Sequence, residues 1–330
     1  MNNITNNLKE GLPFDPAIVF MGTPDYAVPS LEKLVEQGYR VQAVVTQPDR
    51  PRGRGRKLVF PPVKAAARRL DLPVFQPEKA SDRAFCTSIQ DLNPDLLIVV
   101  AFGQVLKKIL LDIPRWGVLN IHASLLPEYR GAAPIQWAII NDASQTGLTA
   151  MRMDEGLDTG PILFQEAVAI GPDETAGELH DRLSRLSGDV LVKTLQGLAT
   201  HGLIERPQDN ALATYAPKID RGMSRIVWNR PARSIAALIR GLDPWPGATT
   251  LAGGKEIKLF SSRVEKPGRP DISGKGVPGR VTGRSADGLL VETGEGRVWI
   301  RELQAPGRRR LAAFEFLRGF PIDEGTVLGI

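Results

Sequence analysis

Short apolar runs alternate with helix-like stretches along residues 17–198. The run 96–102 is nearly all apolar, which is typical of a central parallel strand covered by helices on both faces. The alternation predicts an α/β fold with a doubly wound parallel sheet, whose ligand binds beyond the carboxyl ends of the strands. The predicted strands are 17–22, 41–46, 73–75, 96–102, 118–121 and 148–153, and the predicted helices are 30–37, 62–70 and 175–198.

The pattern changes after residues 203–221, which are polar and show little periodicity, so we interpret them as a linker. A short helix is predicted at 231–240, with a proline in its first turn. Brief β-like runs separated by glycine turns follow and predict a small β-barrel, for which the oligonucleotide-binding type is one candidate. These runs are 257–260, 279–282, 289–292 and 298–303.

Composition narrows the class of protein. A chain of 330 residues suits two domains, and its 42% hydrophobic and 24% charged residues exclude wholesale disorder. One cysteine and three histidines exclude a disulfide scaffold and a cysteine zinc cluster, so we expect no metal. Residues 222–330 hold 18 basic and 11 acidic side chains within a net charge of +5, which indicates a polyanionic partner.

Nothing at the N-terminus resembles a targeting segment. Residues 1–14 lack the basic start and apolar run of a signal peptide and the arginines of a transit peptide, so we interpret them as a mobile leader. The chain also has no run of the roughly 18 apolar residues that a membrane-spanning helix needs. We therefore expect a cytoplasmic protein without membrane contact, and the missing transit peptide favours a bacterial source. Separately, we expect a monomer, since the sequence implies no obligate protein partner.

The densest set of candidate catalytic residues lies in segment 117–137. Asn120 and His122 end an apolar run two positions apart, so in a strand their side chains face the same side. Asp158 follows another predicted strand within a glycine-containing stretch, from which it can reach the histidine. Such a set needs no metal, because a carboxylate favours the imidazole cation and both other side chains can donate to an oxyanion. The residues alone leave open a capping Asn and a structural His.

Several long motifs follow one another in a fixed order. NIHASLLPEYRG contains His122, and Asp158 follows 36 positions later within GLDTG. With these motifs the chain resembles the folate-dependent formyltransferase family almost from end to end. The resemblance implies a Rossmann-like catalytic domain at 15–202, a linker at 203–221 and a tRNA-binding β-barrel of the oligonucleotide-binding type at 222–330. Further matching stretches are MGTPDYAVPSL (21–31), TQPDRPRGRGRKL (46–58), PPVKAAA (61–67), PDLLIVVAFGQVL (94–106), ATYAPKI (213–219) and DPWPGA (243–248).

The resemblance also implies a reaction. It implies transfer of the formyl group of 10-formyltetrahydrofolate to the α-amine of methionine on initiator tRNA, with Asn120, His122 and Asp158 as catalytic residues. We infer that the neutral amine attacks the formyl carbon, and that the oxyanion forms between Asn120 and protonated His122. Asp158 holds the imidazole and helps to remove the amine proton. The implied folate-binding residues are Ser124, Leu125, Leu126, Pro127, Phe102, Gly103 and Gln104, together with the loop near 154–158.

A basic loop occupies residues 49–58, where five cations surround two glycines. On the residues alone, a flexible and solvated loop is the favoured interpretation. Under the resemblance, the loop matches the insertion that separates tRNA-acting members of the family from relatives with small substrates. Arg54 aligns with an arginine of functional importance, and flexible arginines suit the phosphates of an acceptor stem. The tRNA-binding residues predicted in this way are Arg50, Arg52, Arg54, Arg56 and Lys57.

Other functions stay open at this point. A related enzyme would formylate glycinamide ribonucleotide or an amino-sugar nucleotide, and a hydrolase would use water in place of the amine. A catalytically silent RNA-binding protein is the alternative from a different class. The basic loop and the domain at 222–330 favour tRNA over small substrates, whereas the catalytic trio argues against a silent protein. A dinucleotide site is improbable because Gly22 stands alone, without G-x-G-x-x-G.

Overall fold

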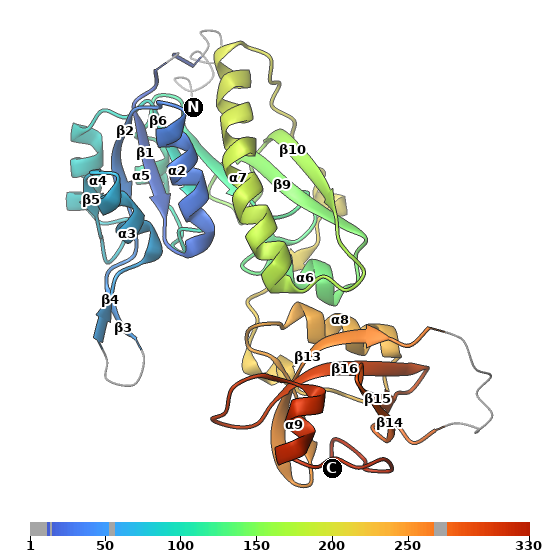
Figure 1. Cartoon of the computed structure of the whole chain (residues 1–330). Coiled ribbons are helices and arrows are strands. Elements are labelled where there is room, and N and C mark those ends of the chain that lie inside the picture. Colours follow the sequence, from blue (N-terminus) through green and yellow to red (C-terminus); the bar gives the residue numbers. More distant parts are fainter. Residues whose placement is uncertain (1–11, 14, 53–56, 267–275) are drawn as a thin grey trace. The chain divides into compact units, whose positions relative to one another are not determined.

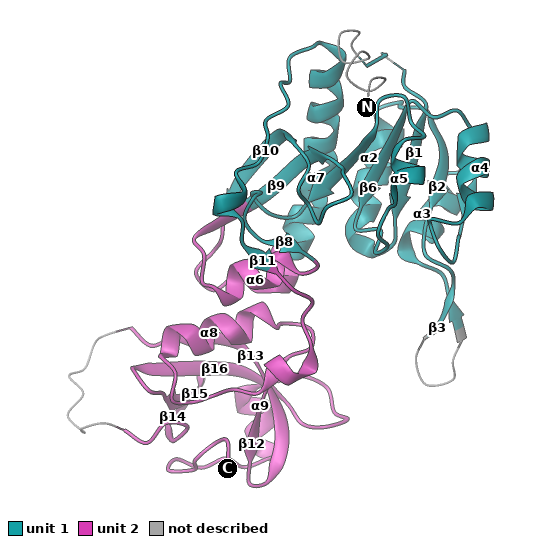
Figure 2. Cartoon of the chain, turned by 180° about the vertical axis from the view of Figure 1, so that it is seen from behind, with its two compact units in different colours: residues 1–131, 147–168, 180–215 teal, residues 132–146, 169–179, 216–330 magenta. Residues whose placement is uncertain are grey.

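The computed structural model describes residues 12–13, 15–52, 57–266 and 276–330 (Figure 1). The chain divides into two compact units (Figure 2). Unit 1 comprises residues 1–131, 147–168 and 180–215, and unit 2 comprises 132–146, 169–179 and 216–330. The predicted leader at 1–14 lies outside the described residues except for Leu12 and Pro13.

A seven-stranded sheet forms the centre of unit 1, in the order β10-β9-β7-β6-β1-β2-β5. Strands β5, β2, β1, β6 and β7 run parallel to one another. All five residues of β6 are buried, which agrees with the prediction of a central strand covered on both faces. The strands are β1 (Ile18–Gly22), β2 (Val41–Val45), β5 (Val74–Phe75), β6 (Leu96–Val100), β7 (Val118–His122), β9 (Gln145–Arg152) and β10 (Ile162–Ala169).

The prediction of an entirely parallel sheet was wrong at β9. This strand runs antiparallel to β7, with His122 opposite Thr149. The connection between them leaves the carboxyl end of β7 and returns to the same edge of the sheet, so the next strand must run back along β7. Hydrophobic periodicity does not encode strand direction, and an antiparallel edge on a parallel sheet is common.

Helices cover both faces of this sheet. On one face, α4 and α5 pack against a cluster that includes Val19, Leu97 and Val99. Elsewhere in the unit, α2 and α7 are joined by a hydrogen bond of 2.7 Å between the hydroxyls of Ser30 and Ser187. The helices are α2 (Val28–Glu36), α3 (Pro62–Arg69), α4 (Arg83–Asp91), α5 (Lys108–Leu111) and α7 (Ala176–Ala199), with a 3-10 turn η1 (Asp25–Ala27).

Unit 2 contains an antiparallel sheet in the order β12-β13-β16-β15-β14, with β17 paired to β16. Buried side chains of α8, such as Ile235 and Ile239, share one core cluster with Leu259 and Ile300 of the sheet. The predicted helix at 231–240 and the predicted β runs are confirmed. The elements are α6 (Pro134–Ile140), α8 (Ala232–Gly241), α9 (Ala313–Gly319), β12 (Ala248–Ala252), β13 (Lys255–Val264), β14 (Val281–Ser285), β15 (Gly288–Glu292), β16 (Arg297–Gln304), β17 (Leu311–Ala312) and the 3-10 turn η3 (Arg221–Ser224).

The first part of the predicted linker has a defined structure and packs within unit 1. Residues up to 215 belong to unit 1, and Arg206 pairs with Ile162 of β10 through two backbone hydrogen bonds of 2.8 Å. A 3-10 turn, η2 (Asn210–Leu212), precedes the short strand β11 (Tyr215–Ala216), which pairs with β8 (Arg130–Gly131). This stretch therefore packs against the catalytic part of the chain.

None of the helices in the described ranges combines the length and the apolarity that crossing a membrane requires. The same ranges contain no group of three or more His, Cys, Asp and Glu side chains that could hold a metal ion. Cys86 is buried in α4, and burial raises the pKa of its thiol.

Replacing Ile98 with alanine tests the central position of β6. Ile98 is fully buried, so we expect the variant to lose about 2–5 kcal/mol of unfolding free energy in urea titrations. Val105→Ala is the control, because Val105 is 81% exposed and its loss should change stability by no more than about 0.5 kcal/mol. Equal effects of the two substitutions would contradict the buried position of the strand.

Candidate active site

Strand β7 carries an amide and an imidazole at the carboxyl end of the sheet. Asn120 lies opposite Val99 of β6 and Met151 of β9, so its strand is paired on both sides. Asn120 and His122 are two positions apart and therefore project from the same face. They are 8% and 7% exposed, respectively. The strand thus holds both polar groups in largely buried positions on one face.

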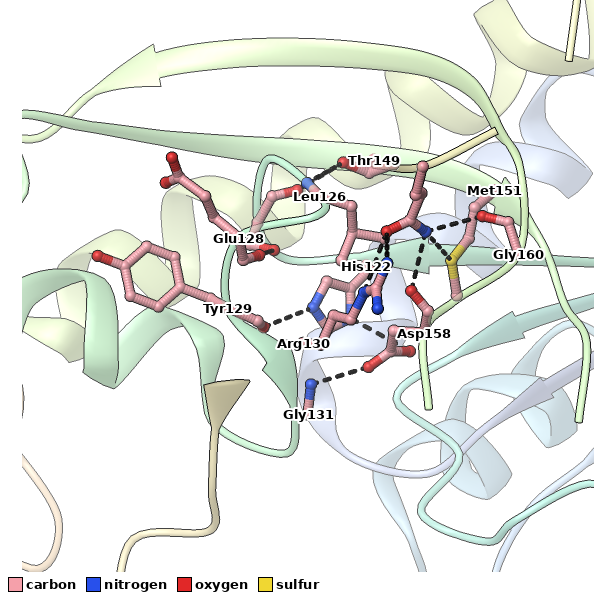
Figure 3. Close-up of polar contacts among 12 residues, drawn as sticks. His122, Leu126, Glu128, Tyr129, Arg130, Gly131, Thr149, Met151, Asp158 and Gly160 are labelled. Carbon is pink, nitrogen blue, oxygen red and sulfur yellow. Dashed lines mark hydrogen bonds and ion pairs between the residues drawn. The ribbon is translucent and has the colours of Figure 1, made fainter. Parts of the chain in front are cut away.

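His122 is contacted from two sides (Figure 3). Its Nε2 lies 3.1 Å from the carbonyl oxygen of Tyr129, and its Nδ1 lies 3.7 Å from Oδ1 of Asp158. Because a carbonyl oxygen can only accept, Nε2 carries the proton of that hydrogen bond. The other nitrogen faces a carboxylate, with which the ring forms an ion pair when it is doubly protonated.

Asp158 approaches the histidine from the loop between β9 and β10. Its Oδ2 accepts a hydrogen bond of 2.9 Å from the backbone N–H of Gly131. Its φ of +54° is left-handed, a conformation that is uncommon outside glycine. Asp154 folds the start of the loop, because its Oδ1 accepts from the Gly156 amide at 3.0 Å and from the Thr159 hydroxyl at 2.7 Å. The carboxylate is therefore held by its own loop and by the loop after β7.

The side-chain amide of Asn120 is open to a ligand. It has no hydrogen-bond partner among the residues that the structure describes. Its nitrogen and oxygen are also not among the fully buried side-chain atoms that lack a partner, so the amide is accessible and can bind a ligand or water. Its N–H groups can donate to negative charge that develops on an oxygen at the same face as His122.

The predicted folate segment at 124–127 is a turn that follows β7. Ser124 is fully buried, and its carbonyl oxygen accepts a hydrogen bond of 2.7 Å from the Thr149 hydroxyl. The same hydroxyl accepts from the backbone N–H of Leu126 at 3.0 Å. Thr149 of β9 therefore fixes the shape of the turn. The half-buried side chains of the turn are Leu125 and Pro127.

The second predicted folate segment, 102–104, follows β6. The carbonyl oxygen of Phe102 accepts a hydrogen bond of 2.8 Å from the Thr23 hydroxyl, and Gln104 accepts one of 2.7 Å from the Ala80 amide. Gly103 is exposed with φ +83°, which leaves its backbone accessible. Because β6 and β7 are parallel neighbours, their carboxyl ends bring both predicted folate segments to one edge of the sheet.

The basic loop begins and ends in a pair of short antiparallel strands, β3 (Arg50–Arg52) and β4 (Lys57–Val59). Arg54 and Arg56 lie outside the described residues, and Arg52 and Lys57 are placed only by their backbone. The guanidinium of Arg50 lies 3.1 Å from the carboxylate of Glu78, and both side chains are exposed. An exposed ion pair of this kind adds little stability.

A buried lysine anchors the base of this hairpin. Lys64 is 7% exposed, and its Nζ donates hydrogen bonds of 2.6 Å to Asp49 Oδ2 and to Gln76 Oε1. Gln76 Nε2 in turn donates to Asp49 Oδ1 at 2.8 Å and to the carbonyl oxygen of Gln47 at 2.9 Å. Because Asp49 directly precedes β3, this network fixes the point from which the basic loop extends.

Two side chains that the sequence analysis did not select complete the site. Arg130 is 2% exposed, and its guanidinium donates to Gln208 Oε1 at 3.1 and 2.7 Å. Gln208 Nε2 donates to the carbonyl oxygen of Asp158 at 2.8 Å. The two residues are 78 positions apart, and one of them lies in the predicted linker. No local pattern pairs them, and only the fold shows that the arginine is buried.

The hydrogen bonds from Lys64 and Gln76 hold the pKa of Asp49 below its usual range. A carboxylate with a lowered folded-state pKa contributes stability that is present above its unfolded pKa and is lost as the pH falls through the folded pKa. We expect Lys64→Met to raise the pKa of Asp49 toward its ordinary value in an NMR titration of the carboxyl carbon. Arg68→Met, which removes a weaker charge contribution, should raise it less. An unchanged pKa in Lys64→Met would contradict the network.

Comparison with known proteins identifies the family. The sequence model described as "Formyl transferase" matches residues 17–195, and the one described as "Formyl transferase, C-terminal domain" matches residues 218–321. The chain therefore belongs to the formyl transferase family. Curated relatives that match it over most of its length are methionyl-tRNA formyltransferases. That of Pelotomaculum thermopropionicum is 50% identical over 94% of this chain and 98% of its own length, and that of Geobacter sulfurreducens is 49% identical over 94% and 96%.

Solved structures share the fold at lower sequence identity. The sugar 3N-formyl transferase WlaRD is 18% identical, with a TM-score of 0.64 over 90% of this chain and 100% of that chain. HypX from Aquifex aeolicus, solved in complex with tetrahydrofolic acid, is 17% identical, with a TM-score of 0.62 over 92% of this chain and 47% of that chain. At such identities the comparison shows a common fold alone.

Proposed function

We propose that this chain transfers the formyl group of 10-formyltetrahydrofolate to the α-amine of methionine on initiator tRNA. The observation that carries the proposal is the similarity to methionyl-tRNA formyltransferases at 50% and 49% identity over 94% of the chain. The site supports it, because an amide, an imidazole and a carboxylate gather at the carboxyl edge of the sheet, where such folds bind their ligands.

The proposed roles follow from the contacts. Asn120 donates from its free amide to the oxyanion that forms when the neutral amine attacks the formyl carbon, and the positive charge of protonated His122 stabilises the oxyanion from the same face. Asp158 holds the imidazole through the contact at Nδ1 and takes part in removing the amine proton. As the new amide bond forms, the bond between the formyl carbon and N10 of the folate breaks, and a proton passes to N10.

The folate is proposed to lie along the carboxyl edge of β6 and β7. The accessible backbone at Gly103 suits a flat, hydrogen-bonding pterin, since no side chain blocks the approach. The turn at 124–127 and the loop at 154–158 would border it. Membership of the formyl transferase family supports this assignment, and so does the hydrogen bond by which Thr149 fixes the shape of the turn.

The finer domain assignments belong to the same proposal. We assign catalysis to 15–202, the linker to 203–221 and tRNA binding to 222–330, where the antiparallel sheet would be completed as a barrel of the oligonucleotide-binding type. The excess of basic side chains in 222–330 supports a role in following the tRNA backbone. The protein would act in the cytoplasm as a monomer, with residues 1–14 as a leader.

Asn120→Ala tests the proposed chemistry. Loss of one oxyanion donor should lower kcat about 10²- to 10³-fold, whereas the Kd for the folate should change little. The measurement follows labelled formyl groups from 10-formyltetrahydrofolate to charged initiator tRNA. Asn141→Ala, at an exposed position after α6, is the matched control and should retain full turnover. Unchanged turnover in Asn120→Ala would remove this residue from the mechanism.

Arg54→Ala tests the proposed role of the basic loop. Loss of a phosphate contact should raise the KM for Met-tRNA about tenfold, which corresponds to roughly 1.4 kcal/mol, and leave kcat unchanged. The slope of log KM against log salt should fall by about 0.7–0.9. Arg83→Ala, which removes an exposed arginine at the start of α4, is the control. If tRNA kinetics are the same in both variants, the loop does not contact the tRNA backbone through Arg54.

A further inference from the structure

The stretch between the two family matches packs against the candidate active site. The first match ends at residue 195 and the second begins at 218, so neither covers residues 196–217. We call residues 203–215 the strap; they belong to unit 1 together with the catalytic residues. Two of its residues, Thr214 and Gln208, contact the loops on either side of His122.

Thr214 holds the loop that contacts one side of His122. Its hydroxyl accepts a hydrogen bond of 2.8 Å from the backbone N–H of Tyr129, and its carbonyl oxygen accepts one of 2.9 Å from that of Arg130. Its own N–H donates to the carbonyl oxygen of Pro127 at 3.3 Å. Tyr129 provides the carbonyl oxygen that accepts from His122 Nε2. The strap therefore fixes one of the two contacts of the imidazole.

Gln208 holds the loop that contacts the other side. Its Nε2 donates to the carbonyl oxygen of Asp158 at 2.8 Å and to that of Gly160 at 2.7 Å. The first of these carbonyls belongs to Asp158, whose φ is +54°, and the second lies two residues further along the loop. A left-handed non-glycine residue costs about 1–3 kcal/mol and persists only when its surroundings hold it. The amide of Gln208 supplies such a restraint at the carbonyl of Asp158 and again at that of Gly160.

Arg130 fixes the orientation of the Gln208 amide. Its guanidinium donates two hydrogen bonds to Gln208 Oε1 and one of 2.9 Å to Asn210 Oδ1. In the ranges that the structure describes, no carboxylate pairs with this buried cation. The positive charge is therefore not cancelled by an ion pair, and it polarises the amide whose N–H groups hold the Asp158 loop. Because a guanidinium can only donate, the atom of Gln208 that faces Arg130 must be the amide oxygen. The amide nitrogen therefore points to the Asp158 loop.

We propose that Gln208 is a positioning residue of the formyl transfer reaction, which acts through Asp158, and that Arg130 sets its orientation. The strap is then part of the active site as well as a connection between domains. The kinetic part of this inference rests on the proposed function. The structural part, that Gln208 holds the carboxylate of Asp158 in place, does not depend on the identity of the substrate.

Gln208→Glu tests the donors to the Asp158 loop most selectively. A glutamate keeps the size of the side chain and an oxygen for Arg130, so the fold should be retained, but it removes both donors to the Asp158 loop. Gln208→Ala removes both sets of contacts. Gln90→Ala, at an exposed position in α4, is the matched control. Urea titration of each variant establishes that the fold is retained.

Two readouts distinguish positioning from general stabilisation. The first is kcat and KM for formylation of Met-tRNA: we expect kcat to fall at least tenfold in both Gln208 variants, with each KM within twofold of the parent value. The second is the hydrogen exchange of the Gly131 amide, which donates to Asp158 Oδ2. Its protection should fall at least tenfold in both Gln208 variants, as it should in Asp158→Ala, and stay unchanged in Gln90→Ala.

The two readouts also separate this inference from the proposed function. If the parent protein does not formylate Met-tRNA, the proposed function is wrong, and the exchange of Gly131 still decides whether Gln208 holds Asp158. If the parent is active but Gln208→Glu retains its kcat, or retains protection at Gly131, the positioning role is wrong. A fall in unfolding free energy with unchanged kcat would show a structural role only.

Discussion

His122 lies on a buried strand and Asp158 on a loop, and the site depends on the contact between their side chains. The Nδ1 to Oδ1 distance of 3.7 Å is kept by hydrogen bonds from outside the pair, since the Gly131 amide binds the carboxylate and the Tyr129 carbonyl binds the other side of the ring. The backbone of Asp158 has a left-handed φ, so neighbouring residues must hold it in this conformation. Strand β9 ends opposite Leu119, near the start of β7, so the loop that follows it has to fold back toward the carboxyl end of β7 for this contact to form.

Part of this arrangement follows from the sequence because it is local. Asn120 and His122 are two positions apart on a strand, so the spacing alone places them on one face, and the uninterrupted apolar run of β6 indicates its central position. The direction of β9 does not follow, because an apolar run reads the same in either direction. Neither does the pairing of Arg130 with Gln208, which is set by the path of the chain across 78 positions.

The choice among substrates depends on features away from the catalytic trio. Formyl transferases with small substrates share the fold, as the match to the sugar 3N-formyl transferase WlaRD shows. The basic loop is the main sequence feature that favours a polyanionic substrate, and its base is a buried network built on Lys64 and Asp49. Lys64 is buried, and its hydrogen bonds of 2.6 Å to Asp49 and Gln76 offset the cost of burying its charge and give the basic loop a fixed origin.

The central claim is formyl transfer from 10-formyltetrahydrofolate to the methionine of initiator tRNA. The most direct measurement supplies the protein with labelled 10-formyltetrahydrofolate and offers charged initiator tRNA, glycinamide ribonucleotide and an amino-sugar nucleotide in separate reactions. We predict label on the α-amine of the tRNA-bound methionine and none on the two small acceptors. Label on a small acceptor alone, or release of labelled formate without any acceptor, would contradict it.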